Sequence, residues 1–421
     1  MEWNAYTSFF VAALAAHRGL ETALDAVQMK HLARRRDRVP EHLVGKVDPD
    51  TIRRAVAYNA EKIRFGMLAR VIDCAALALL VAFGFDALDR AATAIAPGGV
   101  LVGLAFFAGL GLALFLLRLP FDVWSTFSIE ARHGFNRQRP SGFAADKLKE
   151  LALGALVAGP LIAVVLWLSG ALPGTFWLVA FGCVAVFQLL VAWIFPIAIL
   201  PLFNKITPVG GDLAEEIGAL ARRVGFPLRG VVSMDGSRRS AHVNAFIVGL
   251  VGARRIVLYD TLVDKLSRPE LLAVLAHELG HFSLGHVRRR LAVGLVAMLG
   301  AFAALGAVYA DPGLAAGMGF FAWSPHAALA AFSLLAAEAS FPLTWLGRVA
   351  SRRQELAADR FAVAATQGAD LEGALVALHK QNLSSPGSAR AYRAYHNTHP
   401  ALKERLAAIR AIAPDGEGAR A

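Results

Sequence analysis

The stretch that decides the fold is LALGALVAGPLIAVVLWLSGALPGTFWLVAFGCVAVFQLLVAWIFPIAILPLFN, from Leu151 to Asn204, which contains no Asp, Glu, Lys or Arg. A membrane-spanning helix needs about 20 mostly apolar residues, so this stretch is long enough for two helices. Glycines and a proline between 170 and 174 mark the turn that separates them. We predict spans at Leu151–Leu168 and Thr175–Ile199.

Other apolar blocks predict five further spans, for a total of seven. Three are Gly99–Leu117, Leu291–Ala310 and Ala327–Leu346, the last interrupted only by Glu338. Val71–Ala92 has acidic residues crowded at its ends, and Ala5–Val27 carries charges inside it. The chain begins MEWN, without the basic region of a cleaved signal peptide. We predict that this first segment crosses the membrane, and the alternative is that it lies at the interface.

The composition supports a membrane protein. Hydrophobic residues make up 56% of the chain and charged residues 18%, with a mean hydropathy of +0.50. A soluble protein carries roughly 25% charged residues, and a disordered chain has low hydrophobicity. The two cysteines, Cys74 and Cys183, fall inside predicted spans, so we expect neither a metal-ligand role nor a disulfide.

The net charge of +11 sits in alternate connections between the spans. The connections at 30–70, 118–150 and 205–290 and the tail from 348 are basic, whereas those near Pro97, at 172–174 and at 311–325 contain few or no basic residues. Cytosolic loops of membrane proteins carry the excess of Lys and Arg, so we predict an outside N-terminus and a cytosolic C-terminus. Because the charge is spread over every inner loop, a nucleic-acid-binding patch is disfavoured.

A metal-ligand motif lies in LLAVLAHELGHFSLGHV, Leu271–Val287. His277 and His281 are four residues apart and share a helix face, so both imidazoles can reach one ion, while Glu278 points beside that face. This is the arrangement of zinc metalloproteases, in which a carboxylate takes a proton from water that the ion acidifies. Arginines at 288–290 place the site at the cytosolic membrane face. The motif alone leaves open a structural histidine pair on an amphipathic helix.

A catalytic zinc ion keeps three protein ligands and one open position, so a third ligand must come from another segment. Glu355 and Asp359 are four residues apart, just beyond the last predicted span. Spacing leaves two interpretations of Glu355, the third ligand or a solvated charge that pairs with a neighbouring arginine. Asp359 could accept a hydrogen bond from a ligand histidine. His286 lies five residues past His281 and off the ligand face, so we predict that it is not a ligand.

Several blocks resemble the type I CAAX prenyl endopeptidases, which are seven-span integral membrane zinc proteases, and the resemblance covers nearly the whole chain. The blocks are HELGHFSLGH, the Glu355–Asp359 stretch, FSIEARHGFNRQRP at Phe127–Pro140, PLFNKITP at Pro201–Pro208, RRSAHVNAFIVG at Arg238–Gly249, RRIVLYDTL at Arg254–Leu262 and HPALKERL at His399–Leu406. The resemblance implies one Zn²⁺ per chain held by His277, His281 and Glu355, with Glu278 as the base. It also implies a chamber enclosed by the seven helices, and cleavage near the C-terminus of a prenylated CAAX substrate.

A predicted β-hairpin supplies the substrate-binding edge. Ala241–Leu250 and Ile256–Tyr259 are rich in strand-forming residues and are separated by Gly252. The edge of such a hairpin can bind a peptide as an added strand. Asn244 in that edge, followed by Ala245 and Phe246, would hydrogen-bond the substrate backbone, and the alternative is an asparagine that only ends the strand.

Two residues of the HPALKERL block complete the predicted site. His399 would donate a hydrogen bond to the oxyanion, which such reactions require, and its alternative role is to begin a helix before Pro400. We place Arg405 beside the substrate. An ion pair that holds the HPALKERL segment in place is favoured for Arg405 over direct contact with the substrate.

The sequence therefore predicts a mostly α polytopic membrane protein with cytosolic zincin-like metalloprotease elements and a small hairpin or sheet. Residues 1–200 would form a membrane domain with five spans, and residues 201–290 a cytosolic protease segment. Residues 291–346 would hold the last two spans, and residues 347–421 a cytosolic segment with the third ligand.

The predicted function is that of a membrane zinc endopeptidase, whose substrates are peptides or proteins with or without a prenyl group. We expect membrane lipids as its other partners and no nucleic acid. A chain rich in Ala, Arg and Gly is typical of bacteria, so we expect the plasma membrane, or the endoplasmic reticulum membrane in a eukaryote. One alternative is a quality-control protease without prenyl dependence. Another alternative is a transporter or lipid-binding protein in which the HExxH motif is accidental. Carboxylates in or beside the spans, at Asp73, Asp86 and Glu338, would support this alternative.

Overall fold

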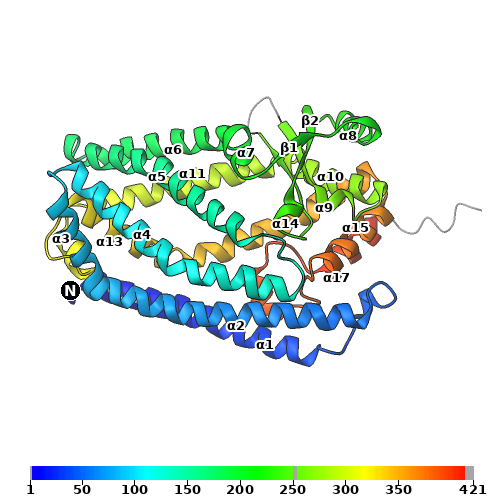
Figure 1. The fold of residues 1–421 in the computed structure, drawn as a ribbon, viewed down its shortest axis with the longest axis horizontal. Helices are drawn as coiled ribbons and strands as arrows, with labels where there is room; N and C mark the ends of the chain where they lie inside the picture. The colour runs from blue at the N-terminus through cyan, green and yellow to red at the C-terminus, as the bar shows by residue number, and fades with distance from the viewer. Residues whose placement is uncertain (1, 250–253, 413–421) are drawn as a thin grey trace, which may run out of the picture.

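The computed structural model describes residues 2–249 and 254–412. Long helices run along the molecule, and a small sheet with short helices lies at one end (Figure 1). The helices that run along the molecule are α1 (Ala5–Arg34), α2 (Pro49–Leu79), α4 (Val100–Trp124), α5 (Pro140–Ala171), α6 (Phe176–Ile194), α11 (His286–Val308), α13 (Pro325–Ala339) and α14 (Phe341–Ala365). The other helices are α3 (Phe85–Ile95), α7 (Leu200–Phe203), α8 (Gly211–Arg223), α9 (Asp260–Val263), α10 (Arg268–Ser283), α12 (Pro312–Gly317), α15 (Gly368–Gln381), α16 (Arg390–His396) and α17 (Leu402–Ile412). The mostly α prediction is confirmed.

Among the described residues, 5 helical stretches are long and apolar enough to cross a membrane. They are Pro49–Ile95, Val100–Glu130, Pro140–Ala171, Phe176–Phe203 and His286–Val308, and each overlaps one predicted span to within two residues at either end of that span. Helices α13 and α14 add a sixth if this pair, bent by 51°, is one broken span. The helices extend well beyond the apolar segments, so the connections predicted at 30–70 and 118–150 are largely helical.

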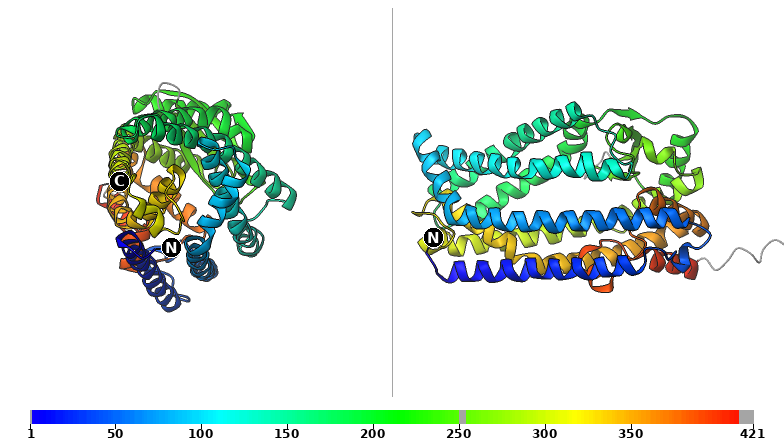
Figure 2. Two further views of the ribbon diagram at one scale, coloured as in Figure 1. Left: turned by 90° about the vertical axis from the view of Figure 1, so that its left-hand side faces the viewer. Right: turned by 60° about the horizontal axis from the view of Figure 1, so that its bottom comes forward.

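Helix α1 lacks a comparable apolar window in the described chain, and its charged side chains pair inside the bundle. Arg18 donates to buried Glu338 of α13 over 2.7 Å, and Asp25 accepts from Arg70 of α2 over 2.9 Å. These pairs hold α1 beside α2 and α13 (Figure 2). The count of seven spans and the enclosed chamber stay predictions.

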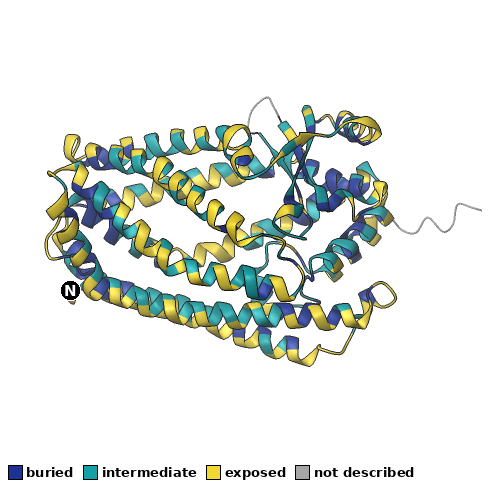
Figure 3. Cartoon of the chain, in the orientation of Figure 1, coloured by how far each residue is buried: buried dark blue, intermediate teal, exposed yellow. Residues whose placement is uncertain are grey.

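Buried residues concentrate at the two ends of the molecule (Figure 3). At the end that carries α3, Phe85, Phe106 and Phe320 pack together. At the other end, α10 and α15 form a core with the sheet. Apolar side chains on the spans between them, such as Leu156 and Val186, are 71% and 68% exposed. Such surface is stable only in an apolar solvent, which agrees with a lipid environment.

The sheet has the strand order β1-β2-β4-β3, with β1 at Ile206–Pro208, β2 at Leu228–Met234, β3 at Ala245–Val248 and β4 at Arg254–Tyr259. Strands β3 and β4 pair antiparallel, which confirms the predicted hairpin, although its turn with Gly252 lies outside the described residues. Strand β4 also pairs in parallel with β2, which the sequence analysis did not identify. Strand β3 is therefore an edge strand.

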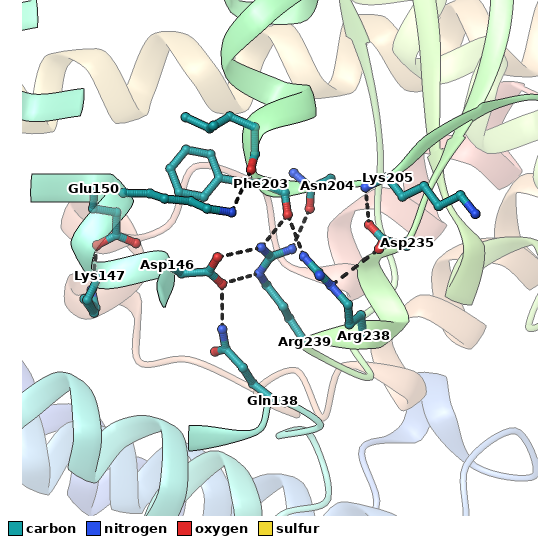
Figure 4. A network of polar contacts seen from close by, with 12 residues as sticks. Gln138, Asp146, Lys147, Glu150, Phe203, Asn204, Lys205, Asp235, Arg238 and Arg239 are labelled. Carbon is teal, nitrogen blue, oxygen red and sulfur yellow. Dashed lines mark hydrogen bonds and ion pairs between the residues drawn. The ribbon is translucent and has the colours of Figure 1, made fainter. Parts of the chain in front are cut away.

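A polar network ties the sheet to the membrane helices (Figure 4). Arg239, just before β3, donates twice to Asp146 of α5 over 2.8 and 3.0 Å, and to Asn204 after α7 over 2.9 Å. Gln138 adds a 2.7 Å bond to the same carboxylate. Bidentate arginine–carboxylate pairs fix orientation as well as distance, so this network sets the place of the edge strand relative to α5.

Candidate metal centre

Helix α10 holds the HExxH motif in a buried position. Ser267 and Glu270 form a capping box at its start, which satisfies backbone donors that a helix end leaves unpaired. Leu271, Leu275 and Leu279 repeat every four residues and are at most 1% exposed. Their burial fixes the rotation of the helix and thereby turns the face with the two histidines toward α14.

Close packing of α10 against α14 brings the third ligand within reach. A side chain in place of Gly280 would meet the Phe361 ring, with its Cβ 3.1 Å from Cδ1. The glycine therefore permits the short distance between these helices. Glu355 on α14 is 3% exposed and lies against both imidazoles, which contradicts the interpretation as a solvated charge.

One ligand atom from each of three residues lies within 4.8 Å of the other two, which is close enough for all three to hold one metal ion. The His277 and His281 Nε2 atoms are 3.2 Å apart, and the Glu355 carboxylate oxygens lie 3.4 Å and 3.3 Å from them. An ion with tetrahedral bonds of about 2.0–2.1 Å separates its ligands by about 3.3–3.4 Å. His277, His281 and Glu355 form the one such group found among the described residues, and they fit one metal ion.

Asp359 and Arg405 form a second layer behind His277. The fully buried Asp359 carboxylate lies 2.8 Å from His277 Nδ1 and accepts two bonds from Arg405, over 2.6 and 2.8 Å. A carboxylate at Nδ1 holds the proton there and leaves Nε2 for a metal. Arg405 thus forms an ion pair, the role that the sequence analysis favoured over direct contact with the substrate.

His286 lies on the far side of His281, with 3.1 Å between the two Nδ1 atoms. It is not part of the converging group in the described chain. This placement agrees with its prediction as a non-ligand, and it can orient the His281 ring.

The polar surroundings set the protonation of the centre. Burial lowers the pKa of His277, but hydrogen bonds to Asp359 and Glu355 outweigh burial and raise this pKa to about 9. Metal ligation requires the deprotonated nitrogen, so ion binding at neutral pH releases a proton. Burial also raises the pKa of Glu278, while His277 and His281 lower it, and a raised pKa makes a carboxylate a better base.

A cavity of about 180 Å³ lies between α10 and the start of β3. Its lining includes Asn244, Ala245, Glu278 and His399, which the sequence analysis assigned to the site. The His399 side chain is 59% exposed, and its Nδ1 lies 2.6 Å from a Glu355 oxygen. The structure therefore brings the predicted base, ligands and substrate edge together.

Two residues differ from the predicted arrangement. Phe246 does not line this cavity among the described residues; it packs against Tyr259 with 6.2 Å between ring centroids, because successive strand residues face opposite sides. Asn382, which the sequence analysis missed, lines the cavity and exchanges hydrogen bonds of 3.1 and 3.3 Å with the Val243 backbone. The separation of 139 residues leaves no local sequence signal for this contact.

Known proteins resemble the chain along almost its full length. Residues 28–205 match the model of the CAAX prenyl protease N-terminal region with five membrane helices, and residues 210–413 match peptidase family M48. A CAAX prenyl protease 1 homologue of Arabidopsis thaliana is 34% identical over 94% of each chain. CAAX prenyl protease 1 of Saccharomyces cerevisiae is 29% identical over 88% of each.

The fold is shared as well. The crystal structure of S. mikatae Ste24p superimposes with a TM-score of 0.91 at 28% identity, covering 97% of this chain and 100% of the other. The likeness therefore extends over both the membrane helices and the metal centre.

Proposed function

The chain belongs to peptidase family M48, among the CAAX prenyl proteases, and from this premise we propose that it is a zinc endopeptidase that cleaves CAAX-type, prenylated substrates near their C-terminus. It is an integral membrane metallopeptidase with several spans. The observation that carries the proposal is the convergence of His277, His281 and Glu355 beside a cavity that is lined by Glu278 and by the start of the edge strand.

Zinc fits this donor set better than magnesium or calcium does. Two imidazole nitrogens and one carboxylate oxygen are the ligands of catalytic zinc sites, whereas the harder cations prefer oxygen ligands alone. When bound, zinc acidifies a water molecule and polarises the scissile carbonyl. Asp359 keeps the His277 ring in its ligating orientation.

The base of the reaction is Glu278. Its carboxylate lines the cavity beside the ligand group, where it accepts a proton from the attacking water and passes it to the leaving amine. Its raised pKa favours the first of these transfers, because a carboxylate of higher pKa takes a proton from water more readily.

His399 and Asn244 act on the substrate. His399 Nδ1 lies 2.6 Å from a Glu355 oxygen, which places the ring beside the ligand group, where it would donate a hydrogen bond to the carbonyl oxygen that gains charge. Asn244 is exposed at the amino end of β3, where its amide can hydrogen-bond a peptide added to the strand.

The proposed location is the bacterial plasma membrane, with the N-terminus outside and the metal centre on the cytosolic side. The support is the alternation of basic and uncharged connections. The basic ends of α1 and α11 lie at the same end of the molecule as α10.

Matched CAAX peptides with and without a prenyl group, offered to the purified protein with and without a chelator, test the proposal. We expect cleavage of the prenylated peptide, loss of cleavage with chelator, and recovery on addition of Zn²⁺. Glu278→Gln should bind zinc and cleave nothing. Equal cleavage of both peptides would favour the quality-control protease, and cleavage that survives the chelator would refute the metal mechanism.

A further inference from the structure

A second, larger cavity adjoins the catalytic one. It has a volume of about 620 Å³ and lies between the end of α1, α15, α16 and the segment that leads into α17. Asn382, His399 and Arg405 line both cavities. The two cavities therefore lie side by side and share part of their walls.

The lining of this cavity is cationic. It contains no Asp or Glu among the described residues, but holds Arg35, Arg393, Lys403, Arg405 and five histidines. Arg405 pairs with Asp359, and Arg393 with Glu404 over 3.1 Å. In the described part of the chain, neither Arg35 nor Lys403 forms a salt bridge, which means that neither has a carboxylate within 4.0 Å. These two charges remain available to an anion.

Hydrogen-bond donors converge at one point in this lining. A Cβ added at Gly387 would lie 3.2 Å from both Arg35 Nη1 and His31 Nε2, so these two groups face the same small space. The Nε2 atoms of His31, His379 and His396 are buried without a hydrogen-bond partner in the described chain. Buried polar atoms are almost always paired in a finished site, so these atoms indicate a ligand.

The electrostatics agree with this view. Burial, followed by the charges of Lys403 and Arg35, lowers the pKa of His42, which also lines the cavity. A histidine is disfavoured as a cation where the local potential is already positive. The same potential attracts an anion.

Strand direction connects the cavity to the substrate. A peptide that adds antiparallel to β3 places its carboxyl end beside the amino end of the strand. That end is Asn244, preceded by Val243, which is hydrogen-bonded to Asn382. Asn382 lines both cavities, so the carboxyl end of such a peptide points from the metal centre into the cationic cavity.

We propose that the cationic cavity binds the free C-terminal carboxylate of the substrate, with Arg35 and Lys403 as its charged partners. The proposal rests on the proposed function. A CAAX end carries three residues beyond its cysteine, which reach about 10 Å when extended. The cavity thereby measures the distance from the cleaved bond to the end of the chain, and so selects substrates that end there.

The test compares two prenylated CAAX peptides that differ only in their end, a free acid and a C-terminal amide. The amide lacks the negative charge that hydrogen bonds from Arg35 and Lys403 would engage, so we expect the intact protein to cleave the acid at least about tenfold more efficiently, mainly through a lower KM. In the Arg35→Gln/Lys403→Gln protein this preference should fall to within about twofold. Arg36→Gln, an exposed neighbour outside the cavity lining, should keep the full preference.

Gly387→Ala provides a variant that keeps every charge. Its methyl group would enter the space between His31 and Arg35, so KM should rise for the acid and stay unchanged for the amide. Zinc content equal to that of the unmodified protein shows that each variant is folded.

Equal cleavage of acid and amide by the unmodified protein would overturn the inference and leave the proposed function intact. Equal cleavage combined with inhibition of both peptides by millimolar inorganic phosphate would assign the cavity to a free anion, and would likewise overturn it. No cleavage of either peptide would overturn the proposed function, and the inference with it.

Discussion

Asp359→Asn should weaken metal binding although Asp359 is not a ligand. The amide retains an acceptor for His277 Nδ1, but its NH₂ group faces the Nε–H of Arg405 where a carboxylate oxygen now accepts at 2.8 Å. The Arg405 side chain is only 12% exposed. An unpaired buried charge costs about 3–5 kcal/mol, and loss of a carboxylate behind a ligand histidine costs about 10- to 100-fold in metal affinity.

Competition with a chromogenic chelator measures the zinc Kd, and thermal unfolding of the zinc-free protein in detergent measures the stability. We expect both to worsen in Asp359→Asn. Glu216→Gln is the matched control, because its 3.8 Å pair with Arg268 is about half exposed and is worth less than about 1 kcal/mol. If Asp359→Asn has the same zinc Kd as the unmodified protein, Asp359 does not support metal binding through His277, even if the variant is less stable.

Three further changes probe the fold. Arg239→Ala should destabilise the protein by about 1.5–3 kcal/mol and slow cleavage, because it removes the bidentate pair with Asp146. The Arg238 side chain is 58% exposed, so Arg238→Ala should cost less than about 1 kcal/mol. Equal losses of stability in the two variants, measured by thermal unfolding, would contradict this prediction. Glu338→Gln should lower stability by about 1.5–3 kcal/mol, because it removes the charged 2.7 Å partner of Arg18 and leaves only the longer 3.4 Å pair with Glu21, and an unchanged melting temperature would show that the Arg18–Glu338 pair is dispensable. Burial, followed by the charge of His42, lowers the pKa of His379 from 6.5 to about 4, so the unfolded chain takes up this proton at a higher pH than the folded chain does. The His379 contribution to stability, full above about pH 6.5, should fall by at most about 3 kcal/mol toward pH 4. Because burial also lowers the pKa of His42 and His396, His379→Gln should reduce the pH dependence of thermal unfolding by this contribution without abolishing it.

The strongly apolar spans and the pair of candidate ligand histidines could be predicted from the sequence because their signals are local, whereas spacing alone left the role of Glu355 open. A run without charge from Leu151 to Asn204 has no other stable environment than lipid, and a four-residue spacing puts His277 and His281 on one helix face. Helix α1 was harder to predict, because its charges are tolerated only through partners on other helices.

The features that the sequence did not reveal depend on contacts between distant segments. Asn382 supports the strand edge through Val243, and Gly280 admits Phe361 of α14. Neither position carries a local pattern that distinguishes it from other asparagines and glycines. Likewise, β2 could not be recognised without its partner β4, whose parallel pairing joins segments on either side of β3.

The metal content of the purified protein and its variants is the most direct test of a catalytic zinc ion held by His277, His281 and Glu355. We expect one zinc ion per chain in the unmodified protein and in Glu278→Gln, with peptide cleavage only in the former. We expect little zinc in His277→Ala and Glu355→Ala, because each removes one of the three converging ligand atoms. Full zinc occupancy in Glu355→Ala, or cleavage of peptide by Glu278→Gln at the unmodified rate, would contradict this mechanism.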